Sequence, residues 1–534
     1  MASATLVGRD PTRPDAVITA VQGGAGSWAV AGLCLAATGP AAARWLRVAQ
    51  REHYLAGSAT RFAARWWRSG ACAGVMAVAA CAGLVAAFWW VPAAVVPGAA
   101  AALGPPGLAV RGRTSPLAWT RRLRTLSGVW LVLALVVAFV GVLVGQPAPM
   151  AAAGALLVPA TVDLACAATA PIERRLAARF VARAALRLRR VAPTVVAITG
   201  SFGKTSTKSY VAHLMGASRA VVASPASFNN RAGLARAVNE HLADGTEIFV
   251  AEMGTYGPGE IAELCSWLPP DVAVITAVGP VHLERFGSED LVLRAKQEIF
   301  ERAPVAVLAV DDDRLAQLAD RIAAEGRRVW RCSAVDLAAD VSVVPDGGGS
   351  TVRIGGAPLA RGAGGHAQPT NVACAVAVAL HLGIERAVLA ERLATLPAVA
   401  HRLEVTRGSS GALVLDDTYN SNPAGARAGL ARLVGVAPPG GRTVVVTPGM
   451  VELGRRQVPE NAAFAGAAAQ QVSHLVVVGR TNRRALLRGA RRAGPGSAEI
   501  VVVPTRQDAV SWVRRNVGPG DAVLYENDLP DHYP

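Results

Sequence analysis

Residues 194–215 read TVVAITGSFGKTSTKSYVAHLM, and this stretch decides the fold of the polar part of the chain. A β-branched apolar run leads into a glycine-containing turn, and a helix-forming stretch follows. In that order of strand, loop and helix, backbone N–H groups and the amino end of the helix face an anion. The segment therefore predicts a phosphate-binding loop in an α/β domain, with Lys204 on the outer phosphates and Thr205 on Mg²⁺.

The loop is a variant, because the usual GxxxxGK[ST] spacing would need glycine where the chain has Ile198. A short glycine motif also arises by chance, but the preceding strand and the GKT core favour a nucleotide site. Only three of the 54 Lys and Arg residues are lysines, namely Lys204, Lys208 and Lys296. Arginine is a poor substitute for a compact phosphate-binding charge or a nucleophilic amine. We therefore expect the three lysines to take part in phosphate binding or in the reaction. Lys208 has no assigned role beyond its place in the motif.

Three further residues are candidates for a metal site. The next expected strand, TEIFVAEMG, ends in Glu252, where an acid would meet a phosphate-bound metal. The structural alternative is a strand-end acid that caps the following segment. His282 follows another apolar strand and Lys296 lies on an expected helix; taken alone, they would be an ordinary loop residue and a solvated helix position.

Residues 24 to 170 hold long Ala/Val/Leu runs, within a 534-residue chain that is 52% hydrophobic. A membrane-spanning helix needs about 20 mostly apolar residues. We expect about five spans, near residues 24–43, 70–90, 94–110, 126–145 and 149–170; prolines weaken the third, which is alternatively a re-entrant hairpin. With five spans, the two arginine-rich links, 44–69 and 111–124, lie on the same side of the membrane as the chain after residue 170. The positive-inside bias therefore predicts a multi-pass protein of a bacterial-type cytoplasmic membrane with its catalytic domains in the cytoplasm.

The net charge of +16 does not indicate nucleic-acid binding, because aromatic residues are only 5% and much of the arginine flanks the apolar runs. The seven cysteines show no CxxC spacing and are expected to be reduced. Residues 171–191, PIERRLAARFVARAALRLRRV, predict a basic amphipathic helix. It either lies on anionic membrane lipids or is a plain connector, and the sequence favours neither.

The segments ITGSFGKTSTK, SFNN, VAEMGTYGPGEI, VGPVHLERFGS, AKQEI, HRLEV, DDTYNSNP and GMVELG, in this order, resemble the Mur ligase family of ATP-dependent amide-forming enzymes. The resemblance implies an α/β architecture: a membrane domain at 1–170, a linker helix at 171–192, a central ATP-binding P-loop domain at 193–396 and a carboxy-terminal Rossmann-like domain at 397–534.

The resemblance also implies roles for individual residues. Thr205 and Glu252 would hold a first Mg²⁺, and His282 with a carbamylated Lys296 a second. Catalytic roles fall to Lys204, Lys296, His282 and Arg402. The implied ATP-binding residues are Gly200, Ser201, Gly203, Lys204, Thr205, Ser206, Asn371, Arg402, Asp417 and Asn420, and the implied substrate-binding residues are Asn229, Asn230 and Tyr419.

The implied reaction is amide bond formation through an acyl phosphate in cell-wall peptide synthesis, most simply the addition of D-alanyl-D-alanine to a muramoyl tripeptide. The chain departs from the family pattern in four places. Membrane spans replace the UDP-sugar-binding domain, Asn461 replaces a common histidine, YENDLPDHY replaces the usual Lys-Gly-Ser, and Ala367 and Gln368 replace a histidine-asparagine pair. The partners expected are therefore peptide or amino-acid substrates, a lipid-linked acceptor or a poly-amino-acid, and membrane lipids. A membrane P-loop ATPase that powers transport and a non-catalytic scaffold are the alternatives of another class.

Overall fold

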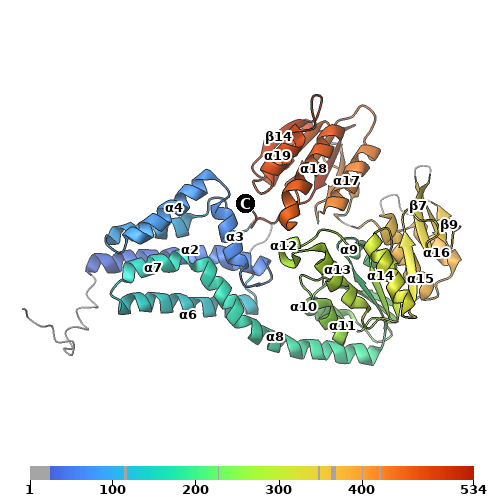
Figure 1. Ribbon diagram of the computed structural model, residues 1–534, viewed down its shortest axis with the longest axis horizontal. Coiled ribbons are helices and arrows are strands. Elements are labelled where there is room, and N and C mark those ends of the chain that lie inside the picture. Colours follow the sequence, from blue (N-terminus) through green and yellow to red (C-terminus); the bar gives the residue numbers. More distant parts are fainter. Residues whose placement is uncertain are drawn as a thin grey trace, which may run out of the picture. The chain divides into compact units, whose positions relative to one another are not determined.

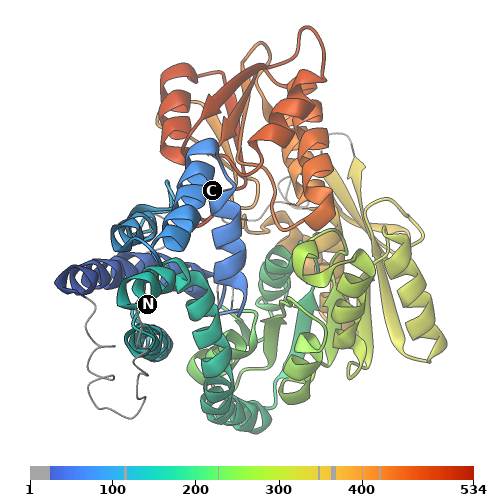
Figure 2. The same ribbon diagram turned by 60° about the vertical axis from the view of Figure 1, so that its left-hand side comes forward.

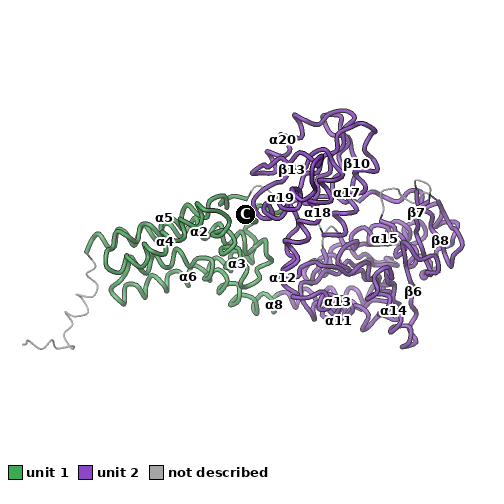
Figure 3. The backbone as a smooth tube through the Cα atoms, turned by 45° about the horizontal axis from the view of Figure 1, so that its top comes forward, with its two compact units in different colours: residues 1–176, 529–534 green, residues 177–528 purple. Residues whose placement is uncertain are grey.

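The computed structural model describes residues 24–534 except 113–116, 226–227, 347–348, 362–367, 400 and 420–421. It divides into two compact units: residues 1–176 with 529–534 form unit 1, and residues 177–528 form unit 2 (Figure 3). The division falls inside one long helix, α8, so the expected linker at 171–192 contributes to both units.

Unit 1 is helical, and small residues let its helices approach closely. Its core contains Ala31, Cys34, Ala94, Ala148 and Ala152, all buried. Large apolar side chains such as Val78, Leu135 and Phe139 lie exposed on its outside, as expected for helices that face lipid. Its elements are α2 (Ala25–Arg51), α3 (Ser58–Trp67), α4 (Ala71–Ala86), η1 (Val91–Ala94), α5 (Val95–Leu103), α6 (Arg121–Leu143), α7 (Pro147–Leu156) and the first part of α8 (Val158–Val191) (Figure 1).

The helices of unit 1 are more broken than the apolar runs suggest. Among the described residues, α2 and α6 are each long and apolar enough to cross a membrane. The pairs α3–α4 and α7–α8 qualify only if each is one bent span, with bends of 111° and 69°. The third expected span is instead η1 followed by the nine-residue α5. Length and composition thus give two to four candidate spans where five were expected, and the number of crossings stays a prediction.

The first part of unit 2 is a nine-stranded sheet in the order β2-β3-β1-β4-β5-β6-β7-β8-β9, parallel as far as β7 and antiparallel beyond it. The expected strand and helix around the phosphate loop are present as β1 and α9. Helices flank the sheet, as alternating strands and helices require (Figure 1). The strands are β1 (Thr194–Thr199), β2 (Val221–Ala223), β3 (Ile248–Glu252), β4 (Val272–Ile275), β5 (Val305–Ala309), β6 (Arg328–Ser333), β7 (Val341–Asp346), β8 (Gly349–Ile354) and β9 (Ala357–Arg361).

The helices of this part are α9 (Lys204–Met215), α10 (Arg231–His241), α11 (Glu260–Trp267), α12 (Leu283–Phe286), α13 (Glu289–Gln297), η2 (Glu298–Phe300), α14 (Asp313–Ala324), α15 (Pro369–His381) and α16 (Arg386–Ala394). Leu214 of α9 and Val376 of α15 are fully buried with Ile198 and Val274 of the sheet. This packing holds the carboxyl end of β1, and hence the phosphate loop, in a rigid frame.

The second part of unit 2 is a six-stranded sheet in the order β10-β11-β15-β12-β13-β14, parallel except for β10 (Figure 2). Its elements are β10 (Glu404–Arg407), β11 (Leu413–Asp417), α17 (Pro423–Val436), β12 (Thr443–Thr447), η3 (Gly454–Arg456), α18 (Gln457–Gln471), β13 (His474–Val478), α19 (Arg483–Arg491), β14 (Glu499–Val503), α20 (Arg506–Asn516) and β15 (Ala522–Glu526). The expected fold class, apolar helices followed by two α/β domains, is confirmed.

Candidate active site

The phosphate loop joins β1 to α9, and its glycines are sterically required. Gly203 has a φ of 83°, and a Cβ there would lie 2.2 Å from Oδ1 of Asn371. A Cβ on Gly200 would lie 2.0 Å from Oγ1 of Thr276. Lys204 donates from Nζ to the carbonyl of Gly200 at 2.7 Å, so the lysine curls back over the loop. The loop therefore has the shape that the sequence predicts for a phosphate cradle.

Glu252 ends β3, which is the neighbour of β1 in the sheet. Its Oε2 accepts hydrogen bonds from Thr205 Oγ1 and Lys208 Nζ, each at 3.0 Å, and its Oε1 accepts from Asn229 Nδ2 at 3.2 Å. Burial alone would raise the pKa of Glu252, but the charges of Lys208 and Lys204 with the hydrogen bonds outweigh it and lower that pKa. The carboxylate is therefore held ionised beside the hydroxyl of Thr205.

Lys208 is a site residue whose role the sequence did not reveal. Its side chain and that of Glu252 are 7% and 3% exposed, so their ion pair is buried. The only signal in the sequence was its rarity, as one of three lysines. The structure gives this lysine a partner that the motif alone could not name.

His282 and Lys296 lie in different surroundings. His282 immediately precedes α12 and has a φ of 50°; its Nδ1 is hydrogen-bonded to Glu452 and its ring stands edge-on to that of Tyr256, with the ring centres 4.9 Å apart. Lys296 is 3% exposed on α13, and burial, with a smaller contribution from the charge of Lys204, lowers its pKa well below the ordinary value. Within the described part of the chain, no hydrogen bond joins His282 to Lys296, and no group of three or more His, Cys, Asp or Glu side chains is arranged for a metal ion.

A cavity of about 130 Å³ lies between the two parts of unit 2. Arg402 enters it with its guanidinium carbon 4.9 Å from the ring centre of Tyr419, and burial lowers the pKa of Arg402. Burial raises the pKa of Asp417 to about 6, although Arg402 opposes the shift. The lining residues are Phe202, Gly203, Ser206, Tyr210, Thr276, Gln368, Thr370, Asn371, Arg402, Leu403, Asp417, Asn422, Ala424, Gly425 and Ala428.

Five of the predicted site residues line this cavity. The cavity is lined by Gly203, Ser206, Asn371, Arg402 and Asp417, whereas Ser201 is buried and its hydroxyl donates to the carbonyl of Gly279. Asn230 caps α10 by accepting from the N–H of Gly233 at 3.0 Å, which is a structural role. Asn420 lies outside the described residues.

Asn461, the replacement for the family's histidine, is fully buried and makes three hydrogen bonds. Its Oδ1 accepts from the N–H of Met450, and its Nδ2 donates to the carbonyls of Met450 and Gln457. These bonds hold the turn that precedes Glu452. The substitution is therefore accommodated by the backbone around it.

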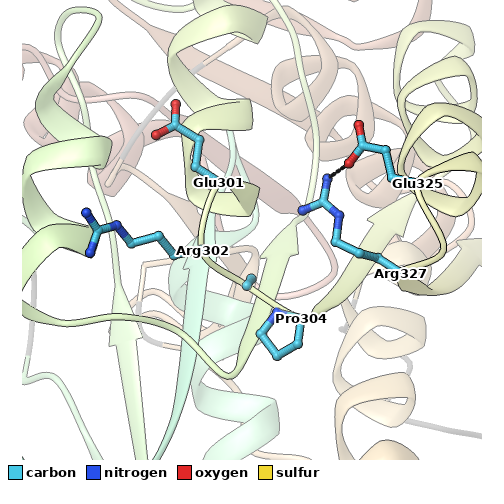
Figure 4. A pocket seen from close by; sticks show the side chains of 6 residues that line it. Glu301, Arg302, Pro304, Glu325 and Arg327 are labelled. Atoms are coloured by element: carbon cyan, nitrogen blue, oxygen red, sulfur yellow. Dashed lines mark hydrogen bonds and ion pairs between the residues drawn. The ribbon is translucent and has the colours of Figure 1, made fainter.

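A larger cavity, of about 590 Å³, lies at the opposite end of the strands. It is bounded by residues 301–304 before β5 and by Glu325 and Arg327 before β6 (Figure 4). Arg327 is already paired with Glu325 and donates to the carbonyl of Phe300. In parallel sheets, ligands bind at the carboxyl ends of strands, so this cavity is not the nucleotide site.

A phosphate loop at the carboxyl edge of a parallel sheet, facing a buried arginine and aspartate from a second α/β domain, defines a P-loop enzyme that acts on a nucleoside triphosphate. Residues 198–379 match the Mur ligase middle domain, and residues 401–525 match the Mur ligase glutamate ligase domain. The chain belongs to the Mur ligase family, whose members are ATP-dependent enzymes that form amide bonds.

Relatives and solved structures agree. The chain is 36% identical over 365 residues to the UDP-N-acetylmuramoyl-tripeptide–D-alanyl-D-alanine ligase of Mycobacterium leprae, covering 62% of this chain and 70% of that protein. It is 31% identical to the Escherichia coli enzyme of the same name, over 59% of this chain and 71% of that one. The MurF ligase of Thermotoga maritima in complex with ADP superimposes with a TM-score of 0.56 at 27% identity, covering 66% of this chain and 80% of the other.

Mur ligases use ATP and Mg²⁺, and the residues present fit both. The hydroxyl of Thr205 and the carboxylate of Glu252 lie within hydrogen-bond distance at the end of the phosphate loop. These are the hard oxygen ligands that Mg²⁺ prefers.

Proposed function

We propose that the chain joins D-alanyl-D-alanine to the tripeptide of a muramoyl acceptor, using ATP. The observation that carries the proposal is the composite cavity, in which the phosphate loop meets Arg402 and Asp417. The identity of 36% to a ligase of that specificity supports the choice of substrates. Because membrane helices stand ahead of the ATP-binding domain, we propose that the reaction occurs at the cytoplasmic face of the membrane.

The residues divide the chemistry between them. The acceptor carboxylate attacks the γ-phosphorus and ADP leaves; the amine then attacks the acyl carbon, phosphate leaves, and the amide forms with loss of a proton. Lys204 and Arg402 neutralise charge on the phosphates during the first step, which is the principal electrostatic task of phosphoryl transfer. Thr205 and Glu252 would hold Mg²⁺, which supplies further positive charge when bound, and Lys208 fixes the carboxylate of Glu252.

Lys296 is proposed to be carbamylated. A carbamate forms when a neutral amine attacks CO₂ and releases a proton, and the result is an anionic oxygen donor. Burial lowers the pKa of Lys296 well below its ordinary value and so favours the neutral amine, which supports the proposal. We expect Lys296→Arg, which cannot form a carbamate, to lose turnover and to gain nothing from added bicarbonate. Full turnover in this variant would rule the carbamate out.

A lipid-linked acceptor is the second candidate, and α8 favours it. Its residues Ile172, Leu176 and Phe180 form an exposed apolar stripe, 40–50% exposed, beside arginines at 175 and 179. Further along, Ala184 and Leu188 are instead buried in the core of unit 2. Residues 172–180 thus have the surface of a lipid-binding helix, and residues 184–188 pack as a connector.

ADP release tests both candidates. The full-length protein would be assayed with D-alanyl-D-alanine and one of three acceptors: the soluble UDP-linked tripeptide, the lipid-linked tripeptide in vesicles, and a glutamate chain. Turnover on the UDP-linked tripeptide supports the main proposal. Turnover confined to the lipid-linked acceptor favours the second, and ADP release that depends on glutamate chains alone would overturn both.

The transport alternative receives no support from Asp163, the acid that the sequence places in an expected span. Its carboxylate accepts hydrogen bonds from the N–H groups of Ala59 and Thr60 and from the Thr60 hydroxyl, at 3.1, 2.8 and 2.5 Å. Asp163 thus caps α3. Intramembrane acids that serve a pathway face a cavity, and this one is committed to a helix end.

A further inference from the structure

Residues 529–534, LPDHYP, belong to unit 1, although the strand before them, β15, belongs to unit 2 (Figure 3). This segment lies within the stretch that replaces the family's Lys-Gly-Ser motif, and the proposed reaction gives it no role. Only Asn527 and Asp528 separate it from the end of β15 at Glu526. The segment is therefore a short extension of unit 2 that packs within the helical unit 1.

The polar groups that receive the segment are themselves buried. Arg47, near the end of α2, is 0% exposed, and its guanidinium contacts Oδ1 of Asp531 at 2.6 Å. The indole N–H of Trp66 donates to the carbonyl of His532 at 2.8 Å. Glu52, 6% exposed, contacts Nε2 of His532 at 3.0 Å. A fully buried guanidinium is costly without an anion, so the surface is built for an acidic residue at position 531.

Aromatic contacts complete the surface. The ring of Phe62 on α3 lies 4.8 Å from that of His532 and 4.9 Å from that of Tyr533, the second in an edge-to-face arrangement. Arg65 lies over Tyr533 at 5.9 Å. The two tail rings are 3% and 9% exposed. Such geometry is favourable for aromatic pairs beyond the area that they bury.

We propose that Arg47, Glu52, Phe62, Arg65 and Trp66 form a docking site for the Asp-His-Tyr segment, and that docking tethers the carboxy-terminal domain to the membrane unit. The chain passes from unit 1 to unit 2 within α8. The docked segment therefore gives unit 2 a second attachment to unit 1. The tether begins at the nucleotide cavity, because the N–H of Asn527 donates to the carbonyl of Asp417 at 3.1 Å and its side chain donates to the carbonyl of Gly449 at 2.7 Å.

The tether has a kinetic consequence, which rests on the proposed use of ATP. About half of the residues that line the ATP cavity belong to the carboxy-terminal domain. Attaching this domain at both of its ends raises its effective concentration at the phosphate loop, which supplies the other side of the cavity. Release of the segment therefore raises the KM for ATP by about three- to tenfold, with little change in kcat at saturating ATP.

The test uses the full-length protein in lipid nanodiscs, with Asp531→Asn as the variant. Hydrogen exchange of backbone amides in α3 is expected to accelerate by about tenfold or more, because the receptor loses the anion that pairs with Arg47. Asp528→Asn is the matched control: it removes an acid three positions earlier, which pairs with Arg506 in unit 2, and should leave exchange in α3 unchanged. His532→Gln, which keeps a polar contact to Glu52, serves if the first variant folds poorly.

A free peptide of residues 527–534 separates docking from tethering. Added to the Asp531→Asn variant, it should restore the protection of α3 but leave the KM for ATP raised, because it is not joined to β15. If the free peptide restored both the protection of α3 and the original KM for ATP, the tethering role would be wrong. Unchanged exchange in α3 would overturn the docking site itself, and this readout does not depend on ligase activity, so it also separates this inference from the proposed function.

Discussion

Replacement of Lys208 by methionine tests whether the buried ion pair organises the candidate active site. The substitution keeps an unbranched side chain of similar length and removes the ammonium that lies 3.0 Å from Oε2 of Glu252. Glu252 would keep its hydrogen bonds from Thr205 and Asn229. The perturbation is therefore limited to one charge and its hydrogen bonds.

Burial sets the magnitude. Removing one partner of a buried ion pair destabilises a protein by about 3–5 kcal/mol, because the other charge is left uncompensated. The two remaining donors and the nearby Lys204 compensate part of this, so we expect a loss of about 2–3 kcal/mol. The pair of Arg190 and Asp244 has a similar separation, 2.9 Å, but its side chains are 65% and 77% exposed, and Arg190→Gln should cost less than about 1 kcal/mol.

Thermal unfolding of unit 2, followed by scanning fluorimetry without and with Mg²⁺ and ADP, measures both variants. We expect Lys208→Met to lower the Tm by roughly 3–8 °C and to weaken the stabilisation that Mg²⁺ and ADP give, since Glu252 is less firmly held. Lys208→Arg retains the positive charge, so its Tm should lie between that of Lys208→Met and that of the unsubstituted protein. If Lys208→Met shifts the Tm no more than Arg190→Gln does, the pair does not organise the site.

Three further predictions follow from buried groups in unit 2. Burial raises the pKa of Glu526 from 4.5 to about 8. The stability that its protonated form contributes is therefore complete below pH 4.5 and is lost as the pH rises through about 8. We expect Glu526→Gln to flatten the fall of Tm between about pH 5 and 9. Asn461→Ala removes the three hydrogen bonds of a fully buried side chain, and urea unfolding should show a loss of about 2–4 kcal/mol. Leu214→Ala empties a fully buried position and should cost about 2–5 kcal/mol, whereas a loss below 1 kcal/mol would mean that the core collapses around the site.

The fold of unit 2 was predictable because its signals are local. The strand, the glycine turn and the helix of residues 194–215 are contiguous, and the glycines at 200 and 203 stand where a side chain would clash. Thr205 and Glu252 could be placed together because neighbouring parallel strands end at the same edge of the sheet. The predicted membership of the Mur ligase family is confirmed on the same segments.

What the sequence missed are pairs that are distant along the chain. Nothing near His282 indicates that Glu452, 170 residues away, will accept its hydrogen bond. Nothing near Arg47 indicates Asp531, 484 residues away. The broken helices of unit 1 were missed for another reason: hydropathy reports composition, whereas the prolines and the tight contacts between small residues decide where each helix ends.

The three lysines now have a common explanation in the charge balance of the site. The charges of Lys204 and Lys208 lower the pKa of Glu252, while burial, together with the charge of Lys204, lowers the pKa of Lys296 and favours its neutral amine. With Arg402 opposite, the basic side chains of Lys204, Lys208 and Arg402 outnumber the carboxylates of Glu252 and Asp417, and burial raises the pKa of Asp417 to about 6. A buried excess of positive charge is unfavourable until an anion arrives, so the site is poised for a polyphosphate and for an anionic modification of Lys296. Arginine at 296 would add a permanent charge to that excess and could not relieve it, which is why the chain, otherwise so rich in arginine, keeps lysine there.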